Sequence, residues 1–265
     1  MNQMKNNAVV GQSGGPTSAI NATLAGVIRG AARARDEGKL GTLYGMRHGI
    51  EGFLSEDMVD LLGIFRDDAD LDTLALTPAA ALGSCRKKLK PAAEDEATYR
   101  RLFEIFEKYD IHFFFYIGGN DSMDTVAKLS AYAATVSYPL TVVGVPKTID
   151  NDLAGTDHTP GFGSAAKYIA ATMREILSDT AVYTVRAVTI VEIMGRDAGW
   201  LTAAAALPGL SGGRAPDLLY FPERPFDKDA FVRSVNAAFE KHPNVVVAIS
   251  EGARYADGTY VGASA

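Results

Sequence analysis

Leu140 to Asp152 reads LTVVGVPKTIDND, and this stretch decides the expected fold. Its apolar beginning, residues 140–145, predicts a buried strand that ends at Pro146. The loop behind it, Lys147 to Asp152, carries a lysine, a threonine and two aspartates. Ligands of open α/β sheets bind beyond the carboxyl ends of the strands, so this loop is a candidate site. An ordinary turn, in which Asp or Thr caps the next helix, is the alternative interpretation.

The rest of the chain alternates apolar runs with amphipathic segments. Further strands are predicted at residues 8–10, 43–47, 111–117, 187–193, 218–221 and 245–249, and helices at 19–34, 94–109, 123–134, 165–177 and 228–242. This alternation predicts an α/β protein with mostly parallel sheets and helices on both faces. If there are two sheets, we expect the boundary between them within residues 155–163.

Composition narrows the function classes. The 265 residues are 47% hydrophobic, which is ample for a buried core, and the net charge of −6 leaves no basic face for nucleic acid or an anionic membrane. The single cysteine, Cys85, excludes an internal disulfide and a cysteine-based metal cage. No segment reaches the roughly 20 apolar residues of a membrane span. We therefore expect a soluble cytoplasmic protein without nucleic-acid or membrane partners.

A glycine loop, Gly11 to Pro16, lies between the first predicted strand and its helix. Glycines let the backbone approach an anion, and helix N-terminal amides add partial positive charge, so this arrangement suits a phosphate. The same residues match the G-x-S-x-G pattern of serine hydrolases, with Ser13 as nucleophile. Against that alternative, the serine follows the first strand, and His158 and His242 have no evident acidic partner.

Four other places carry polar groups that could meet a ligand. They are the Gly83–Lys88 turn with Arg86, the Gly118–Ser122 segment with Asn120 and Asp121, the Met194–Gly195–Arg196 turn, and Glu251. Three of them have an ordinary alternative, because the basic turn could be solvated, Asp121 or Ser122 could cap a helix, and the turn arginine could form a structural salt bridge. A carboxylate at Glu251 could accept hydrogen bonds from a sugar hydroxyl.

Taken together, these groups are what phosphoryl transfer needs. Glycine amides and cations neutralise a phosphate chain, and a carboxylate accepts the proton of the attacking hydroxyl. The candidates are Gly14, Arg86, Asn120, Asp121, Lys147, Thr148, Asp150, Arg196 and Glu251. We expect Asp150 to be the base.

Six motifs resemble those of the phosphofructokinase family, in the same order and with similar spacing. They are SGGPTSAIN (13–21), GGNDS (118–122), PKTIDND (146–152), GFGSAAKY (161–168), EIMGRDAGW (192–200) and SEGARY (250–255). Within that family the sequence looks like the pyrophosphate-dependent branch, because the ATP branch reads GGDGS and GTIDND where this chain has Asp121 and Lys147. The resemblance implies a phosphofructokinase-like fold of two similar α/β domains, the second incomplete.

The resemblance also implies roles for single residues. Asp121 adds bulk and charge where ATP would lie, and Lys147 compensates the charge of pyrophosphate and its leaving phosphate. Gly14 would contact pyrophosphate, Arg86 would lie near the transferred phosphoryl group, and Asp150 would take the proton of the sugar 1-hydroxyl. Fructose 6-phosphate would be held by Thr148, Ile149, Asp150, Asp152, Met194, Gly195, Arg196 and Glu251.

The implied cofactor is Mg²⁺, and the implied assembly is a homo-oligomer. Asn120 stands where many members have a metal-binding aspartate, and an amide oxygen is the weaker ligand. Residues 1–157 would form the donor domain. Residues 158–265 would form a partial sugar-phosphate domain, with the chain returning toward the first domain near 245–265.

Family members continue beyond the point where this chain stops, Gly262 to Ala265. The resemblance therefore predicts a truncated product with an incomplete sugar site and low activity. An ATP-dependent 6-phosphofructokinase and a non-catalytic, phosphosugar-binding regulatory paralogue are the alternatives that the resemblance leaves open.

Overall fold

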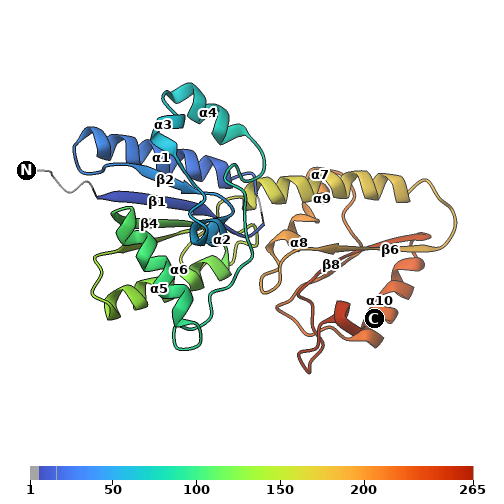
Figure 1. Cartoon of the computed structure of the whole chain (residues 1–265). Coiled ribbons are helices and arrows are strands. Elements are labelled where there is room, and N and C mark those ends of the chain that lie inside the picture. The colour runs from blue at the N-terminus through green and yellow to red at the C-terminus, as the bar shows by residue number, and fades with distance from the viewer. Residues whose placement is uncertain (1–5, 16, 265) are drawn as a thin grey trace, which may run out of the picture. The chain divides into compact units, whose positions relative to one another are not determined.

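The computed structural model describes residues 6–15 and 17–264 (Figure 1). The chain divides into two compact units, Met1–Lys147 and Thr148–Ala265. We expected the division after residue 157, within the loop that follows PKTIDND. The roles assigned to the two domains remain predictions.

The first unit is built on a five-stranded sheet with the strand order β3-β2-β1-β4-β5. Its strands are β1 (Asn7–Gln12), β2 (Leu43–Met46), β3 (Met58–Asp60), β4 (Ile111–Gly118) and β5 (Thr141–Pro146). β1, β2, β4 and β5 pair in parallel, whereas β3 is antiparallel to β2. The three-residue β3 is too short to show an alternating pattern, which is why the sequence did not predict it.

Helices cover both faces of this sheet (Figure 1). They are α1 (Ile20–Asp36), α3 (Leu61–Ile64) and α4 (Asp68–Leu76) on one face, and α2 (Gly49–Leu54), α5 (Glu96–Lys108) and α6 (Asn120–Thr135) on the other. The strands supply both cores by alternation, since Val9 packs into one cluster and Ala8 and Val10 into the other. Both faces are therefore buried, as a parallel sheet requires.

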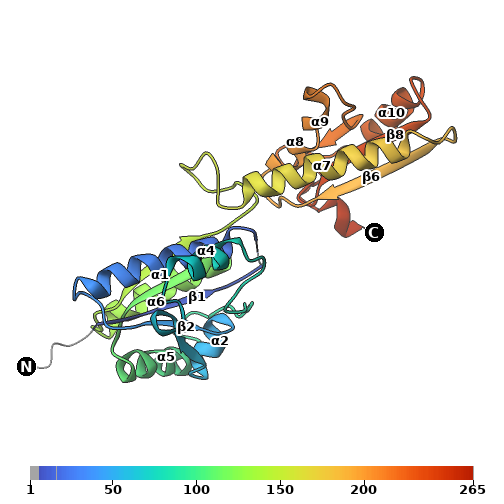
Figure 2. The same ribbon diagram turned by 90° about the horizontal axis from the view of Figure 1, so that it is seen from above.

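The second unit has a three-stranded parallel sheet with the order β6-β8-β7 (Figure 2). Its elements are α7 (Phe162–Thr180), β6 (Ala187–Ile193), α8 (Trp200–Ala204), α9 (Leu207–Leu210), β7 (Leu218–Tyr220), α10 (Lys228–Phe239), β8 (Asn244–Ser250) and the 3₁₀ turn η1 (Val261–Ser264). α7 and α8 pack on one face and α10 on the other.

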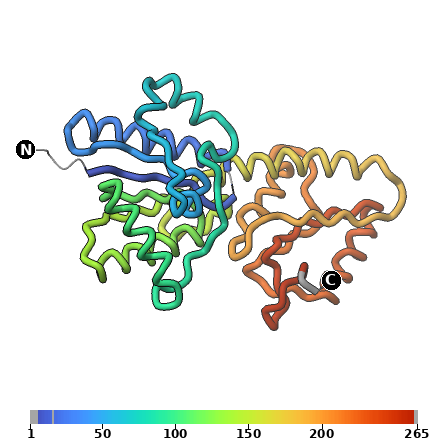
Figure 3. Tube along the Cα trace, in the orientation of Figure 1, coloured from blue at the N-terminus to red at the C-terminus, as the bar shows by residue number. Residues whose placement is uncertain are grey.

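Two features of the backbone matter for the site. Between α4 and α5 the chain runs through residues 77–95 without helix or strand, and Figure 3 traces this segment, which carries the basic turn. Helix α6 begins at Asn120, with Gly119 as its N-cap, rather than near Met123 as the sequence predicted. Asp121 therefore lies in the first helical turn and does not cap the helix.

Across the described residues, 6–15 and 17–264, no helix is both long enough and apolar enough to cross a membrane.

Candidate active site

The glycine loop follows β1 and leads into α1. Gly14 has a φ of +77°, a conformation that glycine adopts at no steric cost. Beside it runs the basic turn: the Gly14 amide donates to the Cys85 carbonyl at 3.2 Å, and the Ser84 hydroxyl donates to the Gly14 carbonyl at 2.5 Å. The strand-end glycine loop and the turn that carries Arg86 are thus joined directly, and the Arg86 side chain is exposed.

Lys147 reaches the glycine loop from the end of β5. Its backbone amide donates to the Gly118 carbonyl at 2.8 Å, and its ammonium donates to the Gly15 carbonyl. A Cβ placed on Gly14 would lie 3.9 Å from the Lys147 ammonium. Lys147 is only 6% exposed, so its charge acts in a partly desolvated place beside the glycine loop.

Asp121 meets a cation from the basic turn. Its carboxylate lies 2.9 Å from the Lys88 ammonium, and both side chains are about two-thirds exposed, at 66% and 68%. An exposed pair of this kind contributes little to stability. The pair instead reduces the net negative charge at the first turn of α6, where Asn120 also lies.

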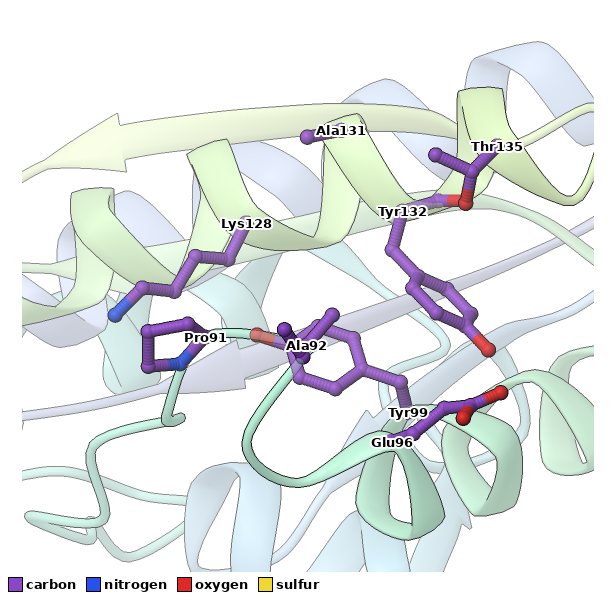
Figure 4. A pocket seen from close by; sticks show the side chains of 9 residues that line it. Pro91, Ala92, Glu96, Tyr99, Lys128, Ala131, Tyr132 and Thr135 are labelled. Atoms are coloured by element: carbon purple, nitrogen blue, oxygen red, sulfur yellow. The ribbon is translucent and has the colours of Figure 1, made fainter.

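The far end of the basic turn is anchored beside a hollow of about 460 Å³ between α5 and α6 (Figure 4). The Lys128 ammonium donates to the Leu89 carbonyl at 2.8 Å, and the Tyr99 hydroxyl donates to the Lys90 carbonyl at 2.7 Å. The walls of the hollow are mostly apolar, with Pro91, Ala92, Ala93, Glu96, Tyr99, Lys128, Ala131, Tyr132 and Thr135 lining it. Its lysine is already engaged, so the hollow is not suited to a phosphate.

In the second unit, the TIDND loop is fixed by its own side chains. The Thr148 hydroxyl donates to Asp152 at 3.0 Å and accepts from the Asp150 amide at 3.1 Å. Asn151 is buried in the left-handed region, with a φ of 58°. Its side chain accepts from the Thr159 amide at 2.8 Å and donates to a carbonyl further along the loop.

The pKa of the Asp150 carboxyl is raised by its surroundings. Partial burial raises the pKa of its carboxyl, and Asp152 and Glu251 add to the effect, while Arg196 opposes it. A carboxylate whose pKa is raised toward neutrality accepts a proton more readily than an ordinary aspartate. The chemistry of Asp150 is therefore set by its neighbours within this unit.

The turn after β6 meets the end of β8. Gly195 has a φ of +133°, and its amide donates to Glu251 at 3.2 Å. The Ser250 hydroxyl donates to the Gly195 carbonyl at 2.5 Å, which fixes the turn from the other side. Arg196 and Met194 flank the glycine with exposed side chains. This turn and Glu251 therefore form one local group.

A statistical description of the family named Phosphofructokinase matches residues 7–264. The chain belongs to the phosphofructokinase family. Two curated proteins named "Pyrophosphate--fructose 6-phosphate 1-phosphotransferase" are among its relatives. The one from Halomonas elongata is 46% identical over 259 residues, and the one from Xanthomonas campestris pv. campestris is 49% identical over 257. The alignments cover 97% and 96% of this chain.

A solved structure agrees. The pyrophosphate-dependent phosphofructokinase from Nitrosospira multiformis superposes with a TM-score of 0.84 at 43% identity, over 97% of this chain and 63% of that one. The chain spans about three fifths of the length of the curated relatives, 61% and 60%. The α/β phosphofructokinase fold predicted from the motifs is confirmed.

Within this phosphofructokinase fold, the predicted site residues fall into two groups. Gly14, Arg86, Asn120, Asp121 and Lys147 belong to the first unit, and Thr148, Ile149, Asp150, Asp152, Met194, Gly195, Arg196 and Glu251 to the second. Ile149 is the one whose side chain packs mainly into a hydrophobic cluster. The partnership of Lys88 with Asp121 and the Ser84 contact were not predicted, because loop contacts leave no periodic signal in a sequence.

The serine-hydrolase alternative has no geometric support. Ser13 is 7% exposed, and its hydroxyl is 3.5 Å from the Cys85 carbonyl. Our expectation that His242 lacks an acidic partner was wrong, because its ring nitrogen lies 2.9 Å from an Asp217 oxygen. That pair belongs to the second unit and Ser13 to the first.

Among the described residues, no group of three or more His, Cys, Asp or Glu side chains is placed to hold an ion. Mg²⁺ commonly binds through one or two protein oxygens and several phosphate oxygens. Asn120 and Asp121, in the first turn of α6, have oxygens that suit a site of this kind.

Proposed function

We propose that this chain belongs to a pyrophosphate-dependent 6-phosphofructokinase. The reaction would move a phosphoryl group from pyrophosphate to the 1-hydroxyl of fructose 6-phosphate, giving fructose 1,6-bisphosphate and phosphate, reversibly. The observation that carries the proposal is the direct approach of Lys147 to the glycine loop, with a carboxylate, Asp121, in the first turn of α6. The names of the two curated relatives support the same reaction for those proteins.

Asp150 would act as the general base. It would accept the proton of the sugar 1-hydroxyl while that oxygen attacks the terminal phosphorus of pyrophosphate. The bond from this phosphorus to the bridging oxygen breaks, and phosphate leaves with the electron pair. The raised pKa of Asp150 suits this step, because a carboxylate with a higher pKa is a stronger base.

Lys147 would stabilise the charge that develops on the donor and on its leaving phosphate. Its ammonium is buried at the glycine loop, where electrostatic attraction is stronger than in water. Gly14 would let the donor lie close to the loop because it has no side chain, and Arg86, exposed on the adjoining turn, would approach the transferred phosphoryl group.

Donor selectivity would come from the first turn of α6. The Asp121 side chain occupies space and carries negative charge where a glycine would leave room for a nucleotide phosphate. Lys88 balances the charge of this carboxylate without removing its bulk. A small donor such as pyrophosphate would fit beside this side chain better than ATP.

The second unit would hold fructose 6-phosphate. Arg196 offers an exposed guanidinium that suits a phosphate or a sugar oxygen. Glu251 uses one carboxylate oxygen, Oε1, to accept from the Gly195 amide, which leaves the other to accept from a sugar hydroxyl. Thr148, Ile149, Asp152 and Met194 would complete the pocket walls.

Mg²⁺ would be carried mainly by the oxygens of pyrophosphate, with Asn120 and Asp121 as the protein groups nearest to it. The ion would neutralise part of the phosphate charge when bound.

The test is phosphorylation of fructose 6-phosphate with Mg²⁺, comparing pyrophosphate with ATP as donor. We would assay this chain and a version extended to the length of its relatives. Activity with pyrophosphate alone supports the proposal, while a preference for ATP contradicts the role of Asp121 and Lys147. Sugar-phosphate binding without turnover in both versions would indicate a non-catalytic protein.

A further inference from the structure

Two buried amide side chains lie beneath the glycine loop and have no part in the site described so far. Gln12 is 0% exposed and Asn21 is 1% exposed. The Gln12 amide nitrogen donates to Asn21 Oδ1 at 2.9 Å and to the Ile20 carbonyl at 3.2 Å, while its oxygen accepts from the Leu82 amide at 2.9 Å. Gln12 therefore joins the end of β1 to α1 and to the segment before the basic turn.

Asn21 extends the same network. Its amide nitrogen donates to the Thr77 carbonyl at 2.9 Å, and its oxygen accepts from the Ala81 amide at 2.9 Å. The segment from Thr77 to Leu82 is neither helix nor strand, so these side chains supply the hydrogen bonds that regular structure would otherwise supply.

The network has little freedom to rearrange. Both Gln12 donor hydrogens and its oxygen are engaged, and the Asn21 oxygen accepts two bonds. Leaving a buried polar group unpaired costs about 1–3 kcal/mol. Breaking one hydrogen bond of the network would also leave its neighbours unpaired, which opposes the change. The segment 77–82 is consequently held in one register against the end of β1.

That register is passed directly to the donor site. Gln12 is two residues before Gly14, and Leu82 is two residues before Ser84. Beyond these anchors, the Gly14 amide donates to the Cys85 carbonyl and the Ser84 hydroxyl donates to the Gly14 carbonyl. The glycine loop and the basic turn are therefore tied twice, once through buried side chains and once at the surface that faces a ligand.

We propose that Gln12 and Asn21 are positioning residues for the phosphoryl donor, because they hold the glycine loop and the basic turn as one pyrophosphate-binding element. The proposal rests on the proposed function for the identity of the donor. Fixing the Gly14 backbone and the Arg86 turn before the donor arrives removes an ordering cost from binding. Neither amide side chain touches the donor itself.

The test uses three isosteric or minimal variants. Gln12→Glu replaces the donating amide with a carboxylate that faces Asn21 Oδ1, and Asn21→Asp removes the donor to Thr77. Ser84→Ala removes only the partly exposed bond to Gly14, so its folding is the least affected. It tests whether joining the glycine loop to the basic turn matters for the donor, even if the two buried variants do not fold.

Asn7→Asp is the matched control. Asn7 lies at the opposite end of the same strand β1, and its side chain also bonds two backbone groups, donating to the Tyr109 carbonyl at 2.7 Å and accepting from the Thr42 amide at 2.8 Å. The substitution removes the same kind of donor without touching the glycine loop or the basic turn.

Cys85 gives a readout that is independent of ligand. It is the single cysteine, 6% exposed, and belongs to the basic turn. In Gln12→Glu and Asn21→Asp, we expect Cys85 to be alkylated under native conditions at least tenfold faster than the fall in stability measured with urea would predict. In Asn7→Asp, the alkylation rate should rise only as much as the fall in stability measured with urea predicts. If the rate is explained by stability in the same way in all variants, the glycine loop and the basic turn are not coupled.

Binding of magnesium pyrophosphate, measured by calorimetry, tests the donor role. We expect about tenfold weaker binding in the two buried variants and about threefold in Ser84→Ala, with the affinity for fructose 6-phosphate unchanged. Unchanged pyrophosphate affinity would overturn the positioning role. A wild-type chain that does not bind pyrophosphate would contradict the proposed function and with it the donor role, whereas the Cys85 rates would still decide whether the loops are coupled.

Discussion

The carboxyl of Asp150 shows how much of the chemistry depends on single residues. Partial burial and the neighbouring carboxylates of Asp152 and Glu251 raise its pKa above the ordinary value of 3.8. Asp150→Asn keeps the shape of the side chain and removes the proposed base. We expect kcat with pyrophosphate to fall by about 10²–10⁴-fold, measured in the version extended to the relatives' length. An unchanged kcat would mean that another group takes the proton.

The same pKa shift makes a prediction for stability. The folded state binds the Asp150 proton more tightly than the unfolded state, so stability is lost progressively as the pH rises from the ordinary pKa through the raised folded pKa. Below the ordinary pKa both states are protonated and the effect vanishes. Asp150→Asn should therefore raise the urea midpoint near about pH 7 and leave it unchanged near about pH 3. A lower midpoint near neutral pH would contradict the direction of the shift.

The proposed donor choice also depends on few residues. The bulk and charge of Asp121, which Lys88 partly balances, should disfavour ATP. Asp121→Gly combined with Lys147→Gly should increase kcat/KM for ATP relative to pyrophosphate by at least tenfold, measured with fructose 6-phosphate saturating. Lys88→Ala should raise the KM for pyrophosphate several-fold, because the unbalanced carboxylate repels it. Lys87→Ala, an exposed neighbour, is the control.

At the scale of elements, the loop between β5 and α7 is held by local side-chain bonds instead of by a sheet. Asn151 takes a φ of 58° there and bonds two backbone groups. Asn151→Ala loses both bonds and leaves an alanine in a conformation that costs about 1–2 kcal/mol. We expect weaker fructose 6-phosphate binding and a lower urea midpoint. Asn151→Gly should recover only the stability that alanine loses through the strained backbone. Equal urea midpoints for the two variants would contradict this account.

At the scale of the whole molecule, each unit has its own hydrophobic clusters. The single cysteine, Cys85, reports on the first unit, and the single tryptophan, Trp200, reports on the second. Leu24→Ala in the core beneath α1 should destabilise by about 2–5 kcal/mol. We expect it to lower the urea midpoint for Cys85 exposure and to leave the Trp200 fluorescence midpoint unchanged. A joint shift would mean that the units unfold together.

Much of the fold could be predicted because it depends on periodicity. Alternating apolar runs predicted seven strands, all found within about two residues, and the motifs at their ends predicted the family. The errors have local causes. β3 is three residues long, and α6 starts at Asn120 because Gly119 serves as its N-cap without any side-chain bond. The His242–Asp217 pair joins residues 25 apart in sequence, which no spacing rule reveals.

The sequence by itself determined the α/β architecture and the candidate chemistry, since strand and helix periods are local and glycines, lysines and carboxylates stand at strand ends. Only the tertiary structure decided what those groups do to one another. It brought Lys147 to a carbonyl 132 residues away, paired Lys88 with Asp121, and locked Gln12 and Asn21 against the segment before the basic turn. Such contacts depend on which residues the fold brings together in space, and the pattern of residues along the chain does not contain that information.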